Sequence, residues 1–448
     1  MQLIASSQSI VVIGLGVTGL SVARYLRDTQ QHFVVMDSRE SPPNLEVFKQ
    51  EFGDVELYLG GLDEERLMQA SEVVISPGLS LQTPELQTAH TAGVSIIGDV
   101  ELFARAVKQP VIAITGSNAK STVTTLVGEM AESCGLSVGV GGNLGVPVLE
   151  LLAQKAIDIF VLELSSFQLE TTSSLKPIAA TVLNVSHDHM DRYASFAEYH
   201  QAKQRIYRHA QTVVINRQDA LTHPPLAKDA KVISFGSDAS DMKSFGVLQQ
   251  GDKTSISYQF SPLIAVEDIA IKGRHNQLNA QAALALGTAA GFDMAKMLST
   301  LKRYRGLPHR CEYVETINGA IYINDSKATN VGATLAAIDG FADGKNIVWI
   351  AGGESKAADF SPLMATIEKH VKCTILIGRD APMIEQAVAS VVSCINESTL
   401  SDAVKRSLEY AANGDVVLLS PACASFDMFA GFEDRGCQFS QIVRELAA

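Results

Sequence analysis

The stretch PVIAITGSNAKST, residues 110–122, decides which fold to expect around it. Val111 to Ile114 form a short apolar strand, which runs into a Gly-containing turn ending in Lys-Ser-Thr. When such a turn opens a helix, backbone N–H groups, the positive helix end and the lysine all face one point. A nucleotide triphosphate binds at such a point, and a hydroxyl there can hold Mg²⁺. Strand, turn and following helix together indicate a parallel α/β domain.

This stretch departs from the general phosphate-loop pattern G-x-x-x-x-G-K-[ST]. Ile114 and Ala119 stand where the two glycines belong. An ordinary strand–turn–helix joint therefore remains an alternative. We expect the turn to bind the phosphates of ATP through Gly116, Ser117, Asn118, Ala119, Lys120, Ser121 and Thr122.

Length and composition favour a soluble protein with several domains. The chain has 448 residues, 46% hydrophobic and 19% charged, which is too long for one core. We expect three domains, 1–98, 99–306 and 307–448, each a mostly parallel sheet with flanking helices. They would be Rossmann-like, phosphate-loop ATPase-like and again Rossmann-like.

The net charge of the chain limits which partners it can bind, and its cysteines indicate the cellular compartment. A net charge of −13 argues against a nucleic-acid partner held by a basic surface. The six cysteines form no C-x-x-C pair, so reduced thiols in a cytoplasm fit best. The start of the chain has no basic leader, and no uncharged apolar stretch reaches about 18 residues, so we expect no membrane association. The absence of repeats and coiled-coil patterning favours a monomer.

A second glycine-rich turn lies near the start of the chain. Residues 8–37 are typical of strand, turn, helix and strand, with Gly14, Gly16 and Gly19 in the turn and Asp37 ending the second strand. This G-x-G-x-x-G fingerprint with a following acid indicates a site for a pyrophosphate and a ribose. NAD, FAD and a UDP-sugar all satisfy that description.

Polar side chains follow two buried strands of the central region. Glu163 comes directly after the apolar run that begins at Ile159, a position suited to holding Mg²⁺, although capping the next helix is an alternative. His187 and His189 lie with acids just after the strand that ends at Leu183. A cluster of this kind beside a phosphate loop favours a functional role over a structural one.

Two asparagines begin a helix whose buried face is rich in Ala and Leu. Asn276 and Asn279 are three residues apart, so they share one helix face and could bind an adenine edge. Capping of the helix N-terminus is the alternative. Beyond Gly306, strands ending in polar residues alternate with helices again, which predicts a third parallel α/β domain.

The chain resembles the Mur ligases of peptidoglycan synthesis over its whole length, through these ordered blocks: TGSNAKST, GGNLG, LELSSFQLE, NVSHDHMDRY, RHNQLNA, GLPHRCE, NDSKATN, GGESKAADFSPL and SPACASFDMF. One departure is Ala119, where the family usually has glycine. A glycine tolerates positive φ, so this turn either keeps φ negative or is slightly strained. The resemblance also implies that the first domain binds a UDP-sugar.

The resemblance implies an ATP-dependent amide ligase that adds D-glutamate to UDP-N-acetylmuramoyl-L-alanine. A carboxylate oxygen attacks the γ-phosphate to give an acyl phosphate, and the amine of D-glutamate then displaces phosphate. Lys120 would neutralise phosphate charge, with Ser121, or alternatively Thr122, and Glu163 on one Mg²⁺. His189 and Lys203 would serve a second Mg²⁺, with Lys203 converted by CO₂ into an anionic carbamate. Composition alone assigns Lys203 no role.

The resemblance also implies roles for the residues of this chain that match the family's other binding residues. Asn276 and Asn279 would meet adenine, while Arg310 and Asp325 would reach the triphosphate and ribose. The UDP-substrate would be held by Val17, Thr18, Asp37, Ser38, Arg39, Gly78 and Asn143. The D-glutamate carboxylates would be held by Thr329, Lys356, Ser425 and the backbone near Phe432. The DNPR block that sister ligases use for a diamino acid is absent.

Three rival interpretations remain at this stage. A folylpolyglutamate-type ligase shares the phosphate loop and the lysine carbamate, but the first domain argues against it. An NAD(P)-dependent oxidoreductase would rest on the Gly14–Gly19 fingerprint and predicts nicotinamide binding. A non-catalytic nucleotide-binding module predicts that Lys120→Ala leaves function intact.

Overall fold

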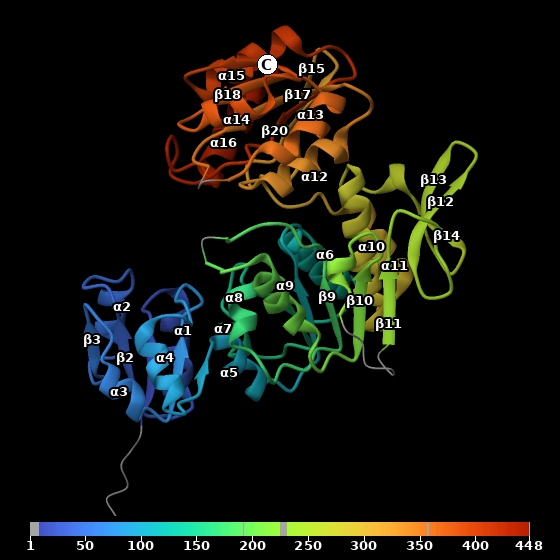
Figure 1. Ribbon diagram of the computed structural model, residues 1–448. Helices are drawn as coiled ribbons and strands as arrows, with labels where there is room; N and C mark the ends of the chain where they lie inside the picture. The colour runs from blue at the N-terminus through green and yellow to red at the C-terminus, as the bar shows by residue number, and fades with distance from the viewer. Residues whose placement is uncertain (1–8, 191, 225–230, 356–357, 448) are drawn as a thin grey trace, which may run out of the picture. The chain divides into compact units, whose positions relative to one another are not determined.

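The computed structural model describes residues 9–190, 192–224, 231–355 and 358–447. In this part of the chain, three mostly parallel sheets and one small antiparallel sheet alternate with helices, coloured from blue to red along the chain in Figure 1. The described chain packs as two compact units. One comprises the chain up to Val185 with His189–Ser234 and Leu284–Met297, and the other comprises the rest. The predicted α/β fold class with mostly parallel sheets is confirmed.

The first sheet has the strand order β3-β2-β1-β4-β5 and is parallel throughout. Its buried residues alternate between two faces: Val12 packs with the core beneath α1 and α2, whereas Val11 and Ile13 pack with that beneath α3 and α4. The elements are β1 (Ile10–Ile13), α1 (Val17–Asp28), β2 (Phe33–Asp37), α2 (Leu45–Glu51), β3 (Leu57–Leu59), α3 (Glu64–Gln69), β4 (Glu72–Ile75), α4 (Pro84–Thr91) and β5 (Ile96–Ile97).

The second sheet carries the phosphate-loop strand at its centre, in the order β11-β10-β9-β6-β8-β7. Strands β6 to β10 run parallel, so their carboxyl ends meet at one edge. The elements are α5 (Asp99–Ala106), β6 (Val111–Thr115), α6 (Lys120–Ser133), β7 (Val138–Gly142), α7 (Val148–Leu152), β8 (Ile159–Glu163), α8 (Ser166–Glu170), β9 (Ala179–Val182), α9 (Phe196–Gln204), β10 (Thr212–Asn216) and β11 (Lys231–Phe235).

A small antiparallel sheet and two helices separate β11 from the last sheet. Strands β12 (Phe245–Gln250), β13 (Lys253–Tyr258) and β14 (Ser261–Ala265) pair in sequence order. Helices α10 (Arg274–Ala289) and α11 (Met294–Arg303) follow. This separate antiparallel sheet was not predicted from the sequence.

The third large sheet has the order β15-β16-β20-β17-β18-β19, with only the β15–β16 pair antiparallel. Trp349 packs into the core beneath α12 to α14, whereas its neighbours Val348 and Ile350 face the core beneath α15 and α16. The elements are β15 (Glu312–Ile317), β16 (Ala320–Asn324), α12 (Val331–Phe341), β17 (Ile347–Gly352), α13 (Met364–His370), β18 (Val371–Ile377), α14 (Ala381–Val388), β19 (Ser393–Asn396), α15 (Leu400–Tyr410), β20 (Val416–Leu419) and α16 (Phe432–Ala447).

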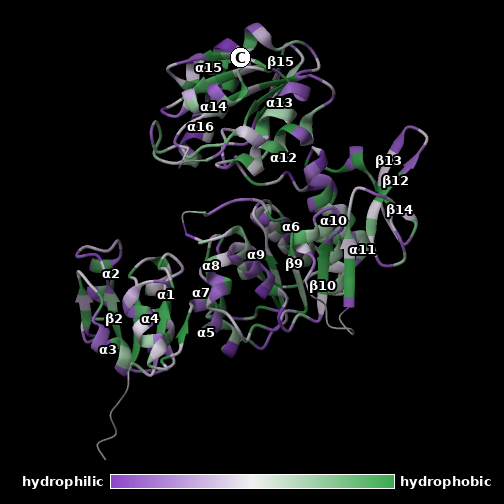
Figure 2. Cartoon of the chain, in the orientation of Figure 1, coloured by the Kyte–Doolittle hydropathy of each residue, from purple (hydrophilic) through white to green (hydrophobic). Residues whose placement is uncertain are grey.

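Hydropathy follows this layered arrangement. The strands of the large sheets are coloured hydrophobic in Figure 2, and most helices carry both colours. Strands buried on both faces and amphipathic covering helices produce that distribution. None of the helices in the described ranges combines the length and apolar character required to cross a bilayer.

Candidate functional site

A cavity of about 440 Å³ opens at the carboxyl ends of β1, β2 and β4. The strand order reverses between β1 and β4, which is where ligands bind in open parallel sheets. A Cβ on Gly19 would lie 1.7 Å from the carbonyl oxygen of Gly14, so only glycine lets α1 approach the turn this closely. Six of the seven residues predicted to hold the UDP-substrate line this cavity: Val17, Thr18, Asp37, Ser38, Arg39 and Gly78.

Asp37 lines this cavity and bonds two other residues there, Leu15 and Arg39. Its carboxylate is 1% exposed and accepts bonds from the Leu15 N–H (2.6 Å), the Arg39 N–H (2.9 Å) and the Arg39 guanidinium (2.7 and 2.8 Å). Burial acts to raise the pKa of Asp37, but the bonds from Arg39 and Leu15 outweigh it and leave that pKa below its usual value. The carboxylate charge is therefore balanced by Arg39, so an anionic ligand in the cavity is not strongly repelled.

The phosphate loop joins β6 to α6, which begins at Lys120. Ala119 adopts the left-handed conformation, with φ 65° and ψ −1°. For a residue with a Cβ this costs about 1–2 kcal/mol, so the strained of the two alternatives is the one observed. Lys120 Nζ donates to the carbonyl oxygens of Gly116 (2.9 Å) and Ser117 (3.0 Å).

Asn184, two residues beyond the end of β9, holds this loop. Its Oδ1 accepts the Asn118 N–H (2.8 Å), its Nδ2 donates to the Asn118 carbonyl (3.2 Å), and its carbonyl accepts the Ser117 N–H (2.9 Å). The Ser117 and Tyr199 hydroxyls share a further bond of 2.8 Å. No role was predicted for Asn184 or Tyr199, because nothing in the sequence places either residue beside the loop.

Glu163 ends β8 with its side chain 2% exposed. Asn143 donates to Oε1 over 2.7 Å, and the Asn143 N–H bonds the Glu163 carbonyl over 2.8 Å. Oε2 is buried and has no hydrogen-bond partner among the described residues. A buried carboxylate oxygen without a partner is costly, and a bound cation would satisfy it. This oxygen therefore fits the predicted Mg²⁺ role.

Lys203 lies on α9 and is 2% exposed, which is rare for a lysine. Nζ donates to the Gly116 carbonyl (2.9 Å) and lies 4.5 Å from the centre of the Tyr199 ring. The predicted metal ligand His189 has φ 57°, and its ring lies 4.9 Å from that of Phe167 and 6.3 Å from that of Tyr199. Among the described residues, His, Cys, Asp and Glu form no group of three suited to a metal.

In the second compact unit, Asn276 and Asn279 lie side by side at the start of α10. Asn279 Nδ2 donates to Asn276 Oδ1 over 2.9 Å, and Asn276 Nδ2 donates to the Lys272 carbonyl over 2.8 Å. Helix α10 begins at Arg274, so neither asparagine occupies the N-cap, and the capping alternative is wrong. The two amides are 6% and 8% exposed.

Asp325 follows β16 and is 7% exposed, and Arg310, which was predicted with it to reach the triphosphate and ribose, is half-buried. The carboxylate accepts bonds from Ser420 Oγ (2.9 Å) and the Cys311 N–H (3.2 Å). Burial raises the pKa of Asp325 to about 7, although these bonds and the Arg310 charge act in the opposite direction.

The predicted D-glutamate residues Thr329 and Ser425 follow β16 and β20, and Phe432 begins α16. The remaining one, Lys356, lies outside the described residues. Ser326 Oγ donates to the Phe432 carbonyl over 2.8 Å, and Lys327 Nζ lies 3.8 Å from the centre of the Phe432 ring.

Arg435 on α16 ties these strand ends together and was not singled out by the sequence. The side chain is 1% exposed and donates to Ser326 Oγ (2.9 Å) and to the carbonyls of Ser326 (2.8 Å), Cys423 (3.2 Å) and Gly352 (3.3 Å). Burial lowers the pKa of its guanidinium to about 10. One side chain thus fixes the loops after β16, β17 and β20.

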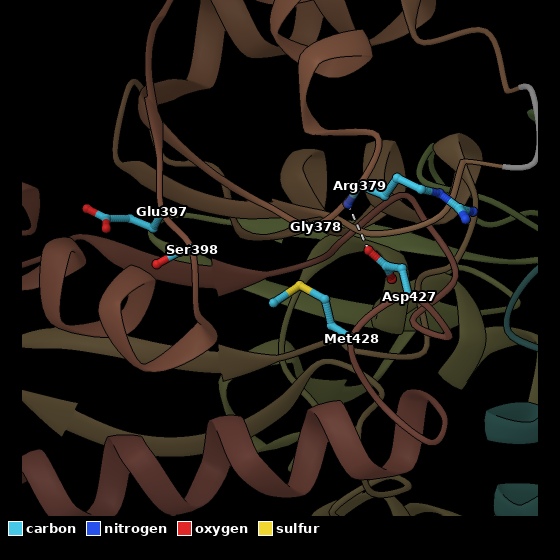
Figure 3. A pocket seen from close by; sticks show the side chains of 6 residues that line it. All are labelled: Gly378, Arg379, Glu397, Ser398, Asp427 and Met428. Atoms are coloured by element: carbon cyan, nitrogen blue, oxygen red, sulfur yellow. Dashed lines mark hydrogen bonds between the residues drawn. The ribbon is translucent and has the colours of Figure 1, made fainter.

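A second cavity, of about 430 Å³, lies at the carboxyl ends of β18 and β19. Figure 3 shows the Met428 side chain reaching between Ser398 and Asp427, while the Arg379 side chain points away from Ser398. The Arg379 N–H donates to Asp427 over 2.8 Å, and the Arg379 guanidinium pairs with Glu354 at 2.7 Å. None of the described D-glutamate residues lines this cavity.

Comparison with known proteins covers the whole chain. Three family descriptions match: Mur ligase MurD-like N-terminal domain (residues 8–98), Mur ligase middle domain (114–287), and Mur ligase glutamate ligase domain (309–423). The UDP-N-acetylmuramoylalanine–D-glutamate ligase of Pseudomonas aeruginosa is 51% identical over 450 residues, covering 100% of both chains.

Solved structures share the fold at low sequence identity. A pseudomurein peptide ligase type C from Methanothermus fervidus superposes with a TM-score of 0.60 at 20% identity, covering 98% of this chain and 100% of that one. The UDP-N-acetylmuramate-alanine ligase MurC of Thermotoga maritima gives a TM-score of 0.57 at 17% identity, covering 98% and 99%. With half of its residues shared along the full length of a curated relative, this chain belongs to the Mur ligase family.

Proposed function

We propose that this chain is the ligase that joins D-glutamate to UDP-N-acetylmuramoyl-L-alanine at the expense of ATP, giving ADP and phosphate. The observation that carries the proposal is the identity of about one half, over the entire chain, to curated ligases named for this reaction. The phosphate loop, the buried Glu163 and the cavity beside Asp37 supply the groups that such a reaction needs. The product is a precursor of peptidoglycan.

The chemistry follows from the charges of the reactants. A carboxylate oxygen of the UDP-substrate attacks the γ-phosphorus and expels ADP, and the amine of D-glutamate then attacks the carbonyl carbon, loses a proton and expels phosphate. Each step brings anions together, so cations supply most of the stabilisation. Lys120 would move from the Gly116 and Ser117 carbonyls to the phosphates, because an anion is a stronger partner than a neutral carbonyl.

Mg²⁺ would be held by Glu163 through its unpartnered Oε2, together with Ser121 from the start of α6. The ion would neutralise phosphate charge. Ser121 is 3% exposed and Glu163 is 2% exposed, so both ligands lie in a region sheltered from water. Asn143 would keep the carboxylate in place and also face the carboxylate-bearing arm of the UDP-substrate.

A second Mg²⁺ would be held by His189 and by Lys203 in the form of a CO₂-derived carbamate. An ammonium repels Mg²⁺, whereas a carbamate offers anionic oxygens. The burial of Lys203 beside the phosphate loop supports this proposal, because a lysine is rarely buried unless its head group has a specific partner.

We assign the remaining ligand groups as follows. Asn276 and Asn279 would bind adenine, and Arg310 and Asp325 the triphosphate and ribose. Thr329, Lys356, Ser425 and the backbone near Phe432 would hold D-glutamate. We also propose domains 1–98, 99–306 and 307–448, a monomeric state and a cytoplasmic location; the separate family matches support the three-domain division.

The test is phosphate release by the purified protein with ATP, Mg²⁺ and UDP-N-acetylmuramoyl-L-alanine across a panel of D- and L-amino acids. Release that depends on D-glutamate alone is the expected result. Release with another amino acid would retain the ligase mechanism but assign a different member of the family. No release with any amino acid would overturn the proposal.

A further inference from the structure

The phosphate loop of this chain contains a backbone conformation that its own residue disfavours. Ala119 has φ 65°, in the left-handed region that glycine adopts freely and that a Cβ makes unfavourable. Such a conformation persists only where the surrounding structure determines it. Some other group must therefore hold the loop at this residue.

The side-chain amide of Asn184 is placed to do so. It bonds both backbone groups of Asn118, accepting the N–H over 2.8 Å and donating to the carbonyl over 3.2 Å. The Asn118 carbonyl belongs to the peptide bond that leads into Ala119. A bond to that oxygen therefore restrains the peptide plane from which the φ angle of Ala119 is measured.

The backbone of Asn184 extends the same restraint by one residue. Its carbonyl accepts the Ser117 N–H over 2.9 Å, so Asn184 contacts two consecutive residues of the loop. The Leu183 N–H next to it bonds the Thr115 carbonyl over 2.9 Å, which anchors this contact to the β6–β9 pairing. The restraint therefore comes from the rigid sheet rather than from the loop itself.

We propose that Asn184 is a positioning residue for ATP: it holds Ala119 in the left-handed turn, so that the N–H groups at the start of α6 face the phosphates before the nucleotide arrives. This inference rests on the proposed function, because it concerns the same ATP site. Its consequence is a coupling between residues 119 and 184. With alanine at position 119 the loop depends on the Asn184 amide, whereas a glycine there would need it less.

The experiment measures kcat and the KM values for ATP and D-glutamate in Asn184→Ala, Asn184→Asp, Ala119→Gly and the double variant Asn184→Ala/Ala119→Gly. Asn184→Asp preserves the shape and the acceptor for the Asn118 N–H but sets a carboxylate oxygen against the Asn118 carbonyl. We expect both Asn184 variants to raise the KM for ATP about tenfold, equivalent to about 1.4 kcal/mol. The KM for D-glutamate should stay within twofold.

The decisive result is the rescue. Ala119→Gly should lower the KM for ATP at least threefold more in the Asn184→Ala background than in the unmodified chain. Gln168 is 4% exposed and accepts the Ser165 N–H over 3.0 Å in the cap of α8, so Gln168→Ala is a control that removes a buried amide bonded to neither the loop nor Asn184. It should leave the KM for ATP unchanged.

Two outcomes would overturn the inference: an unchanged KM for ATP in both Asn184 variants, or an Ala119→Gly effect that is the same in both backgrounds. For any variant that turns over too slowly to assay, calorimetry can measure the affinity for Mg-ADP, and this affinity is then compared between variants in place of the KM for ATP. Failure of the unmodified protein to release phosphate with D-glutamate would instead refute the proposed function. The two failures are thus distinguishable.

Discussion

Asn143 Nδ2 donates to Glu163 Oε1 over 2.7 Å and leaves Glu163 Oε2 buried without a partner among the described residues. One oxygen of this carboxylate is thus used to orient it, and the other is available for a cation. Glu163→Gln retains the shape and removes the charge. We expect it to reduce turnover roughly a hundredfold and to raise the Mg²⁺ concentration needed for half-maximal activity.

The matched control for that change is Glu132→Gln, an exposed acid on α6, which should behave like the unmodified protein. A Mg²⁺ activation curve for Glu163→Gln identical to that of the control would contradict the assignment of Glu163 as a metal ligand.

Lys120 Nζ bonds the Gly116 and Ser117 carbonyls of the loop, and removal of this charge tests the phosphate-binding role. We expect Lys120→Ala to lower kcat by at least about a hundredfold, because the charge that develops on the transferred phosphoryl group loses its partner. Phosphate release is the measurement, and the exposed Lys155→Ala is the control. Full turnover by Lys120→Ala would support the non-catalytic binding module instead.

Lys203 is predicted to act as a carbamate, so its chemistry should depend on CO₂. We expect CO₂-free buffer to depress activity reversibly, and Lys203→Ala to depress it more strongly, with partial recovery when an excess of a small carboxylate is added. The exposed Lys176→Ala serves as the control. If neither treatment changes the rate, the second metal site is wrongly assigned.

Asp325 should make stability depend on pH, since burial raises its pKa to about 7 from an ordinary value of 3.8. Between these two values the folded chain binds more protons than the unfolded chain, so stability falls as pH rises through that range. We expect Asp325→Asn to remove up to roughly 1.4 kcal/mol per pH unit from the pH slope of the unfolding free energy. Denaturant unfolding between pH 5 and pH 7 is the measurement.

Asp343→Asn, an exposed acid in the same unit, should leave that pH slope intact. An equal slope in Asp325→Asn and the unmodified protein would show that Asp325 titrates near its ordinary value.

Arg435 is expected to position the D-glutamate site through the loops that it ties together. Lysine retains the charge but cannot reach the Ser326, Cys423 and Gly352 oxygens in one geometry. We expect Arg435→Lys to raise the KM for D-glutamate about tenfold while leaving the KM for ATP less affected, and to lower the melting temperature. Arg444→Lys, exposed on the same helix, is the control. A lower melting temperature with an unchanged KM for D-glutamate would leave Arg435 with a structural role only.

The sequence predicted most of the fold because the strands are apolar, bounded by turn residues and followed by helices. The Gly14–Gly19 turn, the strand at Val111 and the repeated strand ends after Gly306 each indicated parallel sheets. The antiparallel β15 and the separate sheet β12–β14 were not predicted. Strand direction and sheet membership depend on partners distant in the chain, which local patterns do not contain.

The candidate site shows the same limit in its details. Asp37 and Glu163 carried local signals, since each is an acid at the end of a buried strand. Asn184 and Arg435 carried none, because their roles lie in bonds to backbone groups up to 109 residues away in sequence. The burial of Lys203 could not be predicted either, because the residues of α9 have the composition of a solvent-exposed helix.

The carbonyl oxygen of Gly116 accepts hydrogen bonds from two ammonium groups, those of Lys120 and Lys203. Like charges that share a single neutral acceptor in a sheltered site repel each other more strongly than they would in water. A phosphate group, or the proposed conversion of Lys203 into a carbamate, would relieve this repulsion. In a chain with a net charge of −13, Lys120 and Lys203 thus bring positive charge to the point where the phosphates of ATP are proposed to bind.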